Sequence, residues 1–147
     1  MGFRFKYEAL LKYRMHLRER AEIALGAAQK ELRQNREMMD EYKNSIIEVN
    51  ERLGESLKNG VSSDHIRNYS SYVTILKVRM EQQAALIAKS EKKVAEKMKE
   101  LLDRTMQCNV FEKLKERDLG KWQQDQNIIE QGKMNEAALL RYGKEFL

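Results

Sequence analysis

The chain has 147 residues, no proline, one cysteine and a formal net charge of +5, and 35% of its residues are charged. Its apolar runs are only a few residues long, whereas a membrane span needs about 18 or more, and residues 1–12 lack the apolar core of a secretion signal. This composition excludes a membrane-spanning or disulfide-stapled protein. We expect a soluble cytoplasmic chain.

The first predicted element is a helix over about residues 4–58, because apolar residues recur there with the spacing of a heptad repeat. Four heptads have these residues at positions a and d: Leu25, Ala28, Leu32, Asn35, Met39, Tyr42, Ile46, Val49 and Leu53. Nearer the N-terminus, the apolar spacing between Leu10 and Leu25 becomes 3, 4, 4 and 4. Such a stutter predicts local unwinding of the supercoil.

The next element is a turn over about residues 59–62. Asn59 and Gly60 suit the left-handed conformation that ends many helices, and Ser62 can accept hydrogen bonds from the first amides of a following helix. Val61 and Ile66 flank this cap with the spacing of a hydrophobic staple. The sequence therefore predicts a well-defined reversal of the chain at Gly60.

A second helix is expected from about residue 63, with a long run of residues at position a: Ile66, Val73, Met80, Ile87, Val94, Leu101 and Cys108. Its d positions are less regular: they begin with Tyr69 and Leu76 and continue as Gln83, Ser90, Lys97 and Arg104. Ala84, Met98 and Thr105 lie one place later, which predicts a drift of the seam. We expect close packing near the turn and looser packing beyond it.

Antiparallel coiled coils pair position a of one helix with position d of the other. This rule places Val49 opposite Val73 and Ile46 opposite Leu76, which puts the centre of the fold at Val61. The predicted fold class is all-α, a long two-helix antiparallel coiled-coil hairpin.

This hairpin is predicted to form one domain over residues 1–147. Residues 63–118 of the second helix are expected to pair with the first helix, and residues 119–147 to form an overhanging C-terminal helix. The sequence leaves open whether this tail continues the helix, bends at Gly120 or Gly132, or is disordered until bound.

The positive charge is unevenly distributed. Residues 1–20 contain six Lys or Arg against two acidic residues, and residues 89–117 contain nine against six. The hairpin brings the later part of the second segment beside the first, so the end opposite the turn is basic. A basic end can bind nucleic acid, an acidic membrane surface or an acidic protein channel.

Catalysis has no support in the sequence. His16 and His65 lie at distant points along the proposed hairpin, and no glycine-rich phosphate loop occurs. Neither histidine has a metal-ligand partner at a convincing spacing, and Cys108 at position a is interpreted as a small buried residue. The sequence predicts no enzyme, no metal site, no cofactor and no small-molecule ligand.

Near the turn, Tyr72 and Ile75 point to the flank of the seam. Exposed aromatic and aliphatic groups on a helix are candidate contact sites. Their spacing fits equally well a core that is merely wider at this point, so both interpretations stay open.

Three segments follow one another in a recognisable order: FRFKYEALLKYR at residues 3–14, the turn with RNYSSYVTIL at 67–76 and EQQ at 81–83, and EQGKMNEAA at 130–138. In this order they resemble the FliJ family of the flagellar type III export apparatus. The resemblance covers nearly the whole chain. Asn135 stands where an aspartate is usual in the family.

The resemblance implies a non-enzymatic stalk that inserts into the hexameric ring of the export ATPase and promotes its assembly and hydrolysis. It also implies coupling of that ring to the cytoplasmic domain of the export-gate membrane protein, and contact with export chaperones. The implied location is cytoplasmic and peripheral, at the inner face of the cell membrane at the flagellar base. No nucleic acid is implied.

Two sets of site residues follow from the resemblance. The export-ATPase contacts are Leu10, Leu11, Arg14, Arg18, Trp122 and Ile129, with Ile128 and Leu139 as further apolar contacts of the tail. The export-gate contacts are Tyr42, Tyr72 and Leu76. Arg79 and Gln83 fall on the same patch but differ in kind from the family's residues there, so they receive no role.

One alternative is a generic coiled-coil adaptor or self-associating scaffold, since a second copy could fill the polar d positions and the unpaired tail. A basic helical arm that binds nucleic acid is a weaker alternative, because no nucleic-acid-binding motif accompanies the charge.

Overall fold

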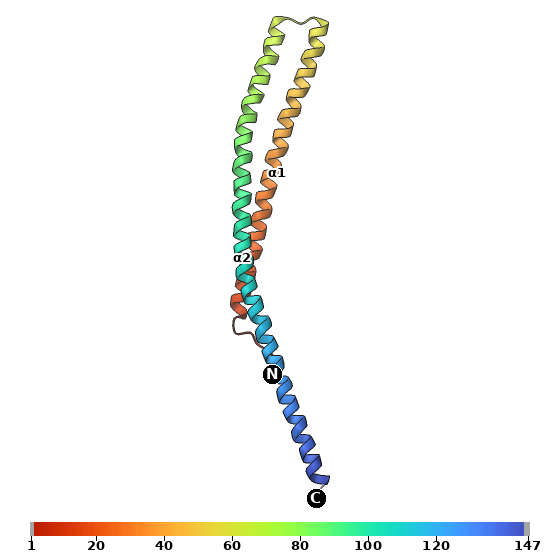
Figure 1. The fold of residues 1–147 in the computed structure, drawn as a ribbon. Helices are drawn as coiled ribbons and strands as arrows, with labels where there is room; N and C mark the ends of the chain where they lie inside the picture. Colours follow the sequence, from red (N-terminus) through yellow and green to blue (C-terminus); the bar gives the residue numbers. More distant parts are fainter. Residues whose placement is uncertain (1, 146–147) are drawn as a thin grey trace. The chain divides into compact units, whose positions relative to one another are not determined.

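The computed structural model describes residues 2–145, which form two long helices (Figure 1). α1 spans Glu8–Asn59 and α2 spans Ser63–Glu145, and no strand occurs among the described residues. The two helices pack against each other, which confirms the predicted all-α hairpin. The first helix begins one turn later than the sequence predicted.

The contacts within the chain group it into two compact units, which we describe one at a time. The turn unit is Arg20–Leu102, and the terminal unit combines Met1–Glu19 with Asp103–Leu147. Within the described residues, no helix has the length and hydropathy that crossing a membrane requires.

The reversal between the helices has the predicted cap. Gly60 has a φ of 78°, a left-handed conformation that glycine adopts without the steric cost of a side chain. The Ser62 hydroxyl oxygen lies 3.4 Å from the amide nitrogen of His65. The Ser62 carbonyl oxygen accepts hydrogen bonds from the amides of His65 and Ile66 at 3.1 and 3.3 Å. Residues just before α2 therefore satisfy amides that a helix start leaves without partners.

In the turn unit, the predicted seam of α1 is confirmed, since every assigned a and d residue from Leu25 to Leu53 is buried or half-buried. The predicted drift of the α2 seam is wrong. Gln83 and Ser90, at position d, are 6% and 4% exposed, whereas Ala84 and Met98 are exposed. The polar side chains stay in the seam because they form hydrogen bonds there.

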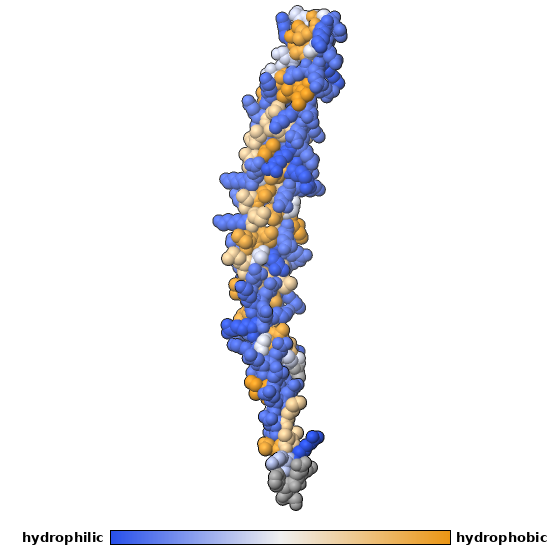
Figure 2. Space-filling model, turned by 45° about the vertical axis from the view of Figure 1, so that its right-hand side comes forward, coloured by the Kyte–Doolittle hydropathy of each residue, from blue (hydrophilic) through white to orange (hydrophobic). Residues whose placement is uncertain are grey.

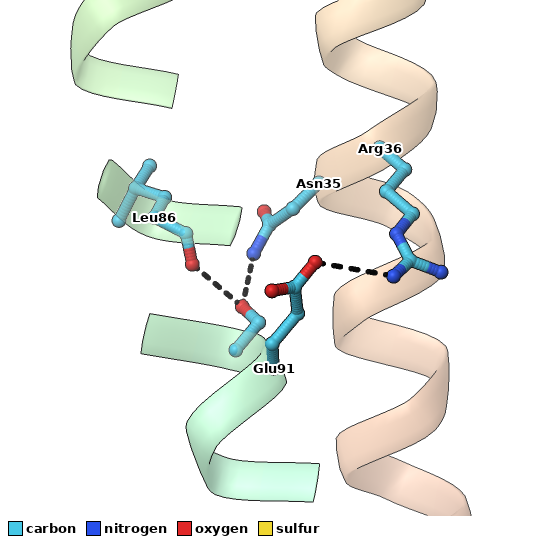
Figure 3. Close-up of polar contacts among 5 residues, drawn as sticks. Asn35, Arg36, Leu86 and Glu91 are labelled. Carbon is cyan, nitrogen blue, oxygen red and sulfur yellow. Dashed lines mark hydrogen bonds and ion pairs between the residues drawn. The ribbon is translucent and has the colours of Figure 1, made fainter. Parts of the chain in front are cut away.

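These hydrogen bonds define a polar layer made of Asn35, Gln83 and Ser90. Figure 3 shows the Asn35 side chain pointing from α1 toward α2 beside Leu86. The Asn35 side-chain amide donates to Ser90 Oγ at 2.6 Å, and Ser90 Oγ donates to the Leu86 carbonyl at 2.9 Å. Gln83 Nε2 donates to the Asn35 carbonyl at 2.8 Å. A fold centre at Val61 places Asn35 opposite residue 87, which lies between Gln83 and Ser90, so the predicted register is confirmed here.

In the terminal unit, Leu17 is half-buried and Leu10 and Tyr13 are exposed, whereas Leu11 is buried and Arg14 and Arg18 are half-buried in the seam. This spacing of three and four continues the heptad repeat of the downstream helix. The predicted stutter is therefore wrong. It was drawn through apolar residues alone, but two arginines occupy seam positions.

The core of the terminal unit is formed by Phe5, Leu11 and Cys108, and Cys108 is fully buried. The expectation of looser packing away from the turn is wrong, since these residues are among the most buried in the described chain. Phe5, Leu11 and Cys108 fill this part of the seam, whereas Met39, Tyr42 and Tyr69 are half-buried in the seam of the turn unit.

The non-helical segment before α1 packs on α2 through aromatic rings. The ring centroids of Phe3 and Trp122 are 6.1 Å apart, and those of Tyr7 and Phe111 are 6.4 Å apart. Phe5 also makes an edge contact with Tyr7 at 5.9 Å. These distances are typical of attractive aromatic pairs. Residues 3–7 thus cover part of α2 without being helical.

α2 continues as one helix past Gly120 and Gly132 to Glu145. The structure thereby resolves the question that the sequence left open about a bend in the tail. Every residue from 127 to 143 is exposed.

Candidate protein-interaction surfaces

The described residues contain no group of three or more His, Cys, Asp or Glu side chains that could hold a metal ion. One hollow lies between the two helices beside the turn, and the face shown in Figure 2 is mostly hydrophilic with scattered apolar groups. Exposed helix faces and grooves of this kind suit contacts with other proteins.

The turn unit has a groove of about 390 Å³ beside the reversal of the chain. It is lined by Ser45, Glu48, Val49, Arg52, His65, Asn68, Tyr69 and Tyr72. Glu48 accepts a hydrogen bond from Arg52 at 2.7 Å, and His65 makes an edge contact with Tyr69 with ring centroids 5.9 Å apart. The α1 side of the groove thus has a Glu48–Arg52 ion pair, and the α2 side has aromatic rings.

Of the three residues assigned to the export gate, Tyr72 lines this groove and is 44% exposed. Tyr42 is half-buried in the seam, and Leu76 is 2% exposed. Leu76 therefore stabilises the helix pair in this conformation and offers almost no surface to a partner. Gln83, which had no assigned role, belongs to the polar layer.

α2 has an exposed apolar face next to Tyr72. We call Tyr72, Ile75, Val78 and Leu86 the turn-side surface; each is between 44% and 49% exposed. At about 100° per residue, the four side chains lie within about 120° of one another around the helix. The sequence left open whether Tyr72 and Ile75 are exposed or belong to a wider core. Both are exposed, so neither is part of the core.

The α1 residues assigned to the export ATPase differ in exposure. Leu10 is 46% exposed, whereas Leu11 is 4% exposed and lies in the core of the terminal unit. Arg14 donates a hydrogen bond to Gln107 Oε1 at 2.8 Å, and its buried Nε has no partner. Arg18 forms an ion pair with Glu112 at 3.5 Å. Both arginines are therefore partly used in holding α1 against α2.

The α2 residues assigned to the export ATPase also differ. Trp122 is half-buried against Phe3, whereas Ile128, Ile129 and Leu139 are exposed. These three belong to the continuous exposed stretch of residues 127–143. We call this stretch the tail surface.

Cys108 lies between the two helices of the terminal unit. Burial raises the pKa of its thiol above the ordinary value of 9.0; Arg18 opposes this rise, and the carboxylate of Glu112 adds to it. The Cys108 Sγ atom lies 3.5 Å from Glu112 Oε1 and donates to it. A protonated thiol is a poor nucleophile, so the geometry agrees with a packing role.

An all-α chain with two paired helices, a groove and apolar helix faces is a coiled-coil protein suited to binding other proteins. The particular family follows from comparison with known proteins. The family described as flagellar FliJ protein matches residues 3–145, and the chain belongs to this family. This membership assigns it to the flagellar type III export system.

One solved structure shares the fold. A YscO homologue from Chlamydia trachomatis is 20% identical to this chain, with a TM-score of 0.50 over 96% of each chain. At this level of identity the similarity shows the fold alone. No curated protein matches the chain.

Proposed function

We propose that the chain is a non-enzymatic stalk of the flagellar export machinery, and that its terminal unit enters the central pore of the export ATPase ring. The observation that carries this proposal is the tail surface, a helical stretch exposed from residue 127 to residue 143. Ile128, Ile129 and Leu139 in this stretch are between 49% and 71% exposed.

Charge supports the same assignment. Residues 1–20 carry six basic residues against two acidic ones, and this segment belongs almost entirely to the terminal unit. An acidic channel would attract such a unit before any apolar contact forms. Leu10, Arg14 and Arg18 on α1 and Trp122 and Ile129 on α2 are the proposed contacts, and buried Leu11 supports them from the core.

The proposed mechanism is mechanical. A single helical stalk inside a ring contacts the subunits unequally, so its binding energy favours some subunit conformations over others. This bias promotes ring assembly and hydrolysis without any catalytic group on the stalk. The turn-side surface, with Tyr72 at its edge, is the proposed contact with the cytoplasmic domain of the export gate, supported by Tyr42 and Leu76 from the seam.

This contact with the gate would hold the protein at the inner face of the cell membrane at the flagellar base. Export chaperones are further proposed partners, for which no residue is assigned.

ATP hydrolysis by the cognate export ATPase, measured while this protein is titrated in, tests the ring contact. We expect stimulation by the wild type, and loss of stimulation with Leu10→Asp or Ile129→Asp because both side chains are exposed contacts. Tyr72→Asp is the matched control, since it places the same charge on an exposed apolar position of the other unit and should still stimulate. Circular dichroism checks that all three variants remain helical.

Binding to the cytoplasmic domain of the gate protein, measured by calorimetry, tests the second contact. Tyr72→Asp and Ile75→Asp should weaken this binding by about tenfold or more, as expected when an apolar anchor contributes about 1.4 kcal/mol or more. Leu10→Asp should leave it unchanged. Absence of both stimulation and low-salt co-purification would refute the stalk, and a concentration-dependent increase in mass by light scattering would favour the self-associating scaffold.

A further inference from the structure

The seam residues of the turn unit repeat every seven residues. Spacing alone therefore does not determine how α1 and α2 are aligned along each other. The a and d residues of α1 from Leu25 to Leu53 recur every seven residues, and so do those of α2. A slip of α2 along α1 by one heptad would again place mostly apolar residues in the seam. Such a slip displaces one helix against the other by about 10 Å.

We propose that the polar layer of Asn35, Gln83 and Ser90 sets the register of the two helices. Gln83 and Ser90 are almost fully buried, and each polar side chain in the layer has a hydrogen-bond partner. Buried polar side chains in a coiled coil favour the pairing that satisfies them, because an unsatisfied buried group costs more free energy than a neutral contact gains.

The size of the side chains makes the layer selective. Ser90 is small, and its Oγ lies only 2.6 Å from the Asn35 amide nitrogen (Figure 3). A slip in one direction puts Gln83 in the place of Ser90 and Leu76 in the place of Gln83, and Leu76 cannot donate to the Asn35 carbonyl. A slip in the other direction puts Lys97 in the place of Ser90, and the Lys97 ammonium has no acceptor for the hydrogen bond of the Asn35 amide. Both slips lose hydrogen bonds that the observed register makes.

Two ion pairs next to the layer agree with this register but do not select it as strongly. Arg36 lies 3.2 Å from Glu91, and Lys93 lies 3.0 Å from Glu31. All four side chains are about half exposed, and exposed ion pairs contribute little. The buried layer is therefore the stronger constraint, and it lies about 36 Å along α1 from the turn, at about 1.5 Å per residue.

Chemical cross-linking of cysteine pairs tests the proposal. All variants carry Cys108→Ala and a seven-residue glycine–serine insertion after Gly60, so that the turn no longer restricts slipping. Glu31→Cys with Lys93→Cys reports the observed register, because these side chains face each other. Glu31→Cys with Leu86→Cys, one heptad nearer the turn along α2, reports the slipped register that puts Gln83 in the place of Ser90. A short bismaleimide is the cross-linker.

With the polar layer intact, we expect cross-linking of the 31/93 pair and none of the 31/86 pair. With Asn35→Leu, Gln83→Leu and Ser90→Ala, both pairs should cross-link, and the midpoint of thermal unfolding should not fall. Met39→Leu with Ile87→Leu is the matched control, because it changes an adjacent apolar layer at similar volume and should keep the 31/93 pattern.

Two outcomes would overturn the proposal. Cross-linking of both pairs while the polar layer is intact would show that the layer does not select the register. Cross-linking of the 31/93 pair alone in the helical apolar-layer variant would show that other seam residues or the ion pairs select it. Circular dichroism distinguishes a slipped helix pair from an unfolded one.

Discussion

The turn unit and the terminal unit use different chemistry to solve the same packing problem. In the turn unit, uncharged side chains such as Leu25, Ala28 and Tyr42 fill most of the seam, with one neutral polar layer. In the terminal unit, aromatic rings, a thiol and two arginines occupy it. The same heptad spacing therefore accommodates two kinds of seam. One consists mainly of residues that stabilise the helix pair, and the other includes residues that are also proposed to contact a partner.

The largest effect is expected from removing one buried leucine in each unit. Leu11→Ala and Leu76→Ala should each cost about 2–5 kcal/mol, the range for truncating a buried leucine. Hydrogen exchange should accelerate in residues 8–19 and 103–122 for Leu11→Ala, and in residues around 42–53 and 69–83 for Leu76→Ala. Leu10→Ala, at an exposed neighbour, is the control and should change little. If either buried variant accelerates exchange across the whole chain, the two units unfold together and the comparison fails.

A smaller effect is expected from alkaline pH, and it should arise in the terminal unit. Because the pKa of the Cys108 thiol is raised on folding, the folded chain keeps a proton that the unfolded chain loses above pH 9.0. This contribution to stability is present below pH 9.0 and is lost as the pH rises through the folded pKa.

The midpoint of thermal unfolding, measured between pH 8 and pH 11, checks this sign. It should fall more steeply for the wild type than for Cys108→Ala, which has no thiol to ionise. Effects of pH that are common to both proteins cancel in the difference. Parallel curves for the two proteins would contradict the assignment.

The smallest effect is expected from the ion pairs that join the helices. Double-mutant cycles should give a coupling of at most about 1 kcal/mol for Arg18 with Glu112 in the terminal unit. The coupling for Lys93 with Glu31 in the turn unit should be smaller still, since both side chains are about half exposed, whereas Arg18 is only 26% exposed. A larger coupling in the turn unit would show that exposure does not rank these pairs.

Much of the fold could be predicted from the sequence because it depends on spacing and on one turn. The apolar period located the seam of α1, and Gly60 with Ser62 located the reversal. These features are local. Their physical effect depends on the backbone conformation of a few residues and hardly on distant contacts.

The errors have a common physical cause, since each treated a polar residue as belonging to the surface. Gln83 and Ser90 are buried because α1 and their own helix offer hydrogen-bond partners, and Arg14 lies in the seam because Gln107 accepts its hydrogen bond. Hydropathy alone cannot foresee such partners. A strict heptad count would have placed all three residues at seam positions.

The candidate sites were less predictable than the fold. A motif names residues without showing which side of a helix they occupy, and Leu11 and Leu76 proved to be buried next to exposed Leu10 and Ile75. The aromatic contacts of residues 3–7 with α2 were not foreseen, because the periodic signal of a helix is absent there. The alternation of Phe3, Phe5 and Tyr7 is the signal that could have indicated them.

Trp122 is the only tryptophan in the chain, and its ring lies against Phe3. Indole emission shifts when an adjacent ring is replaced by water, so the native fluorescence of this protein reports whether the segment before α1 is seated on α2. No dye or label is needed for that observation. The same spectrum can be followed while a partner is added. The emission of Trp122 then reports whether binding changes the contact between Phe3 and Trp122.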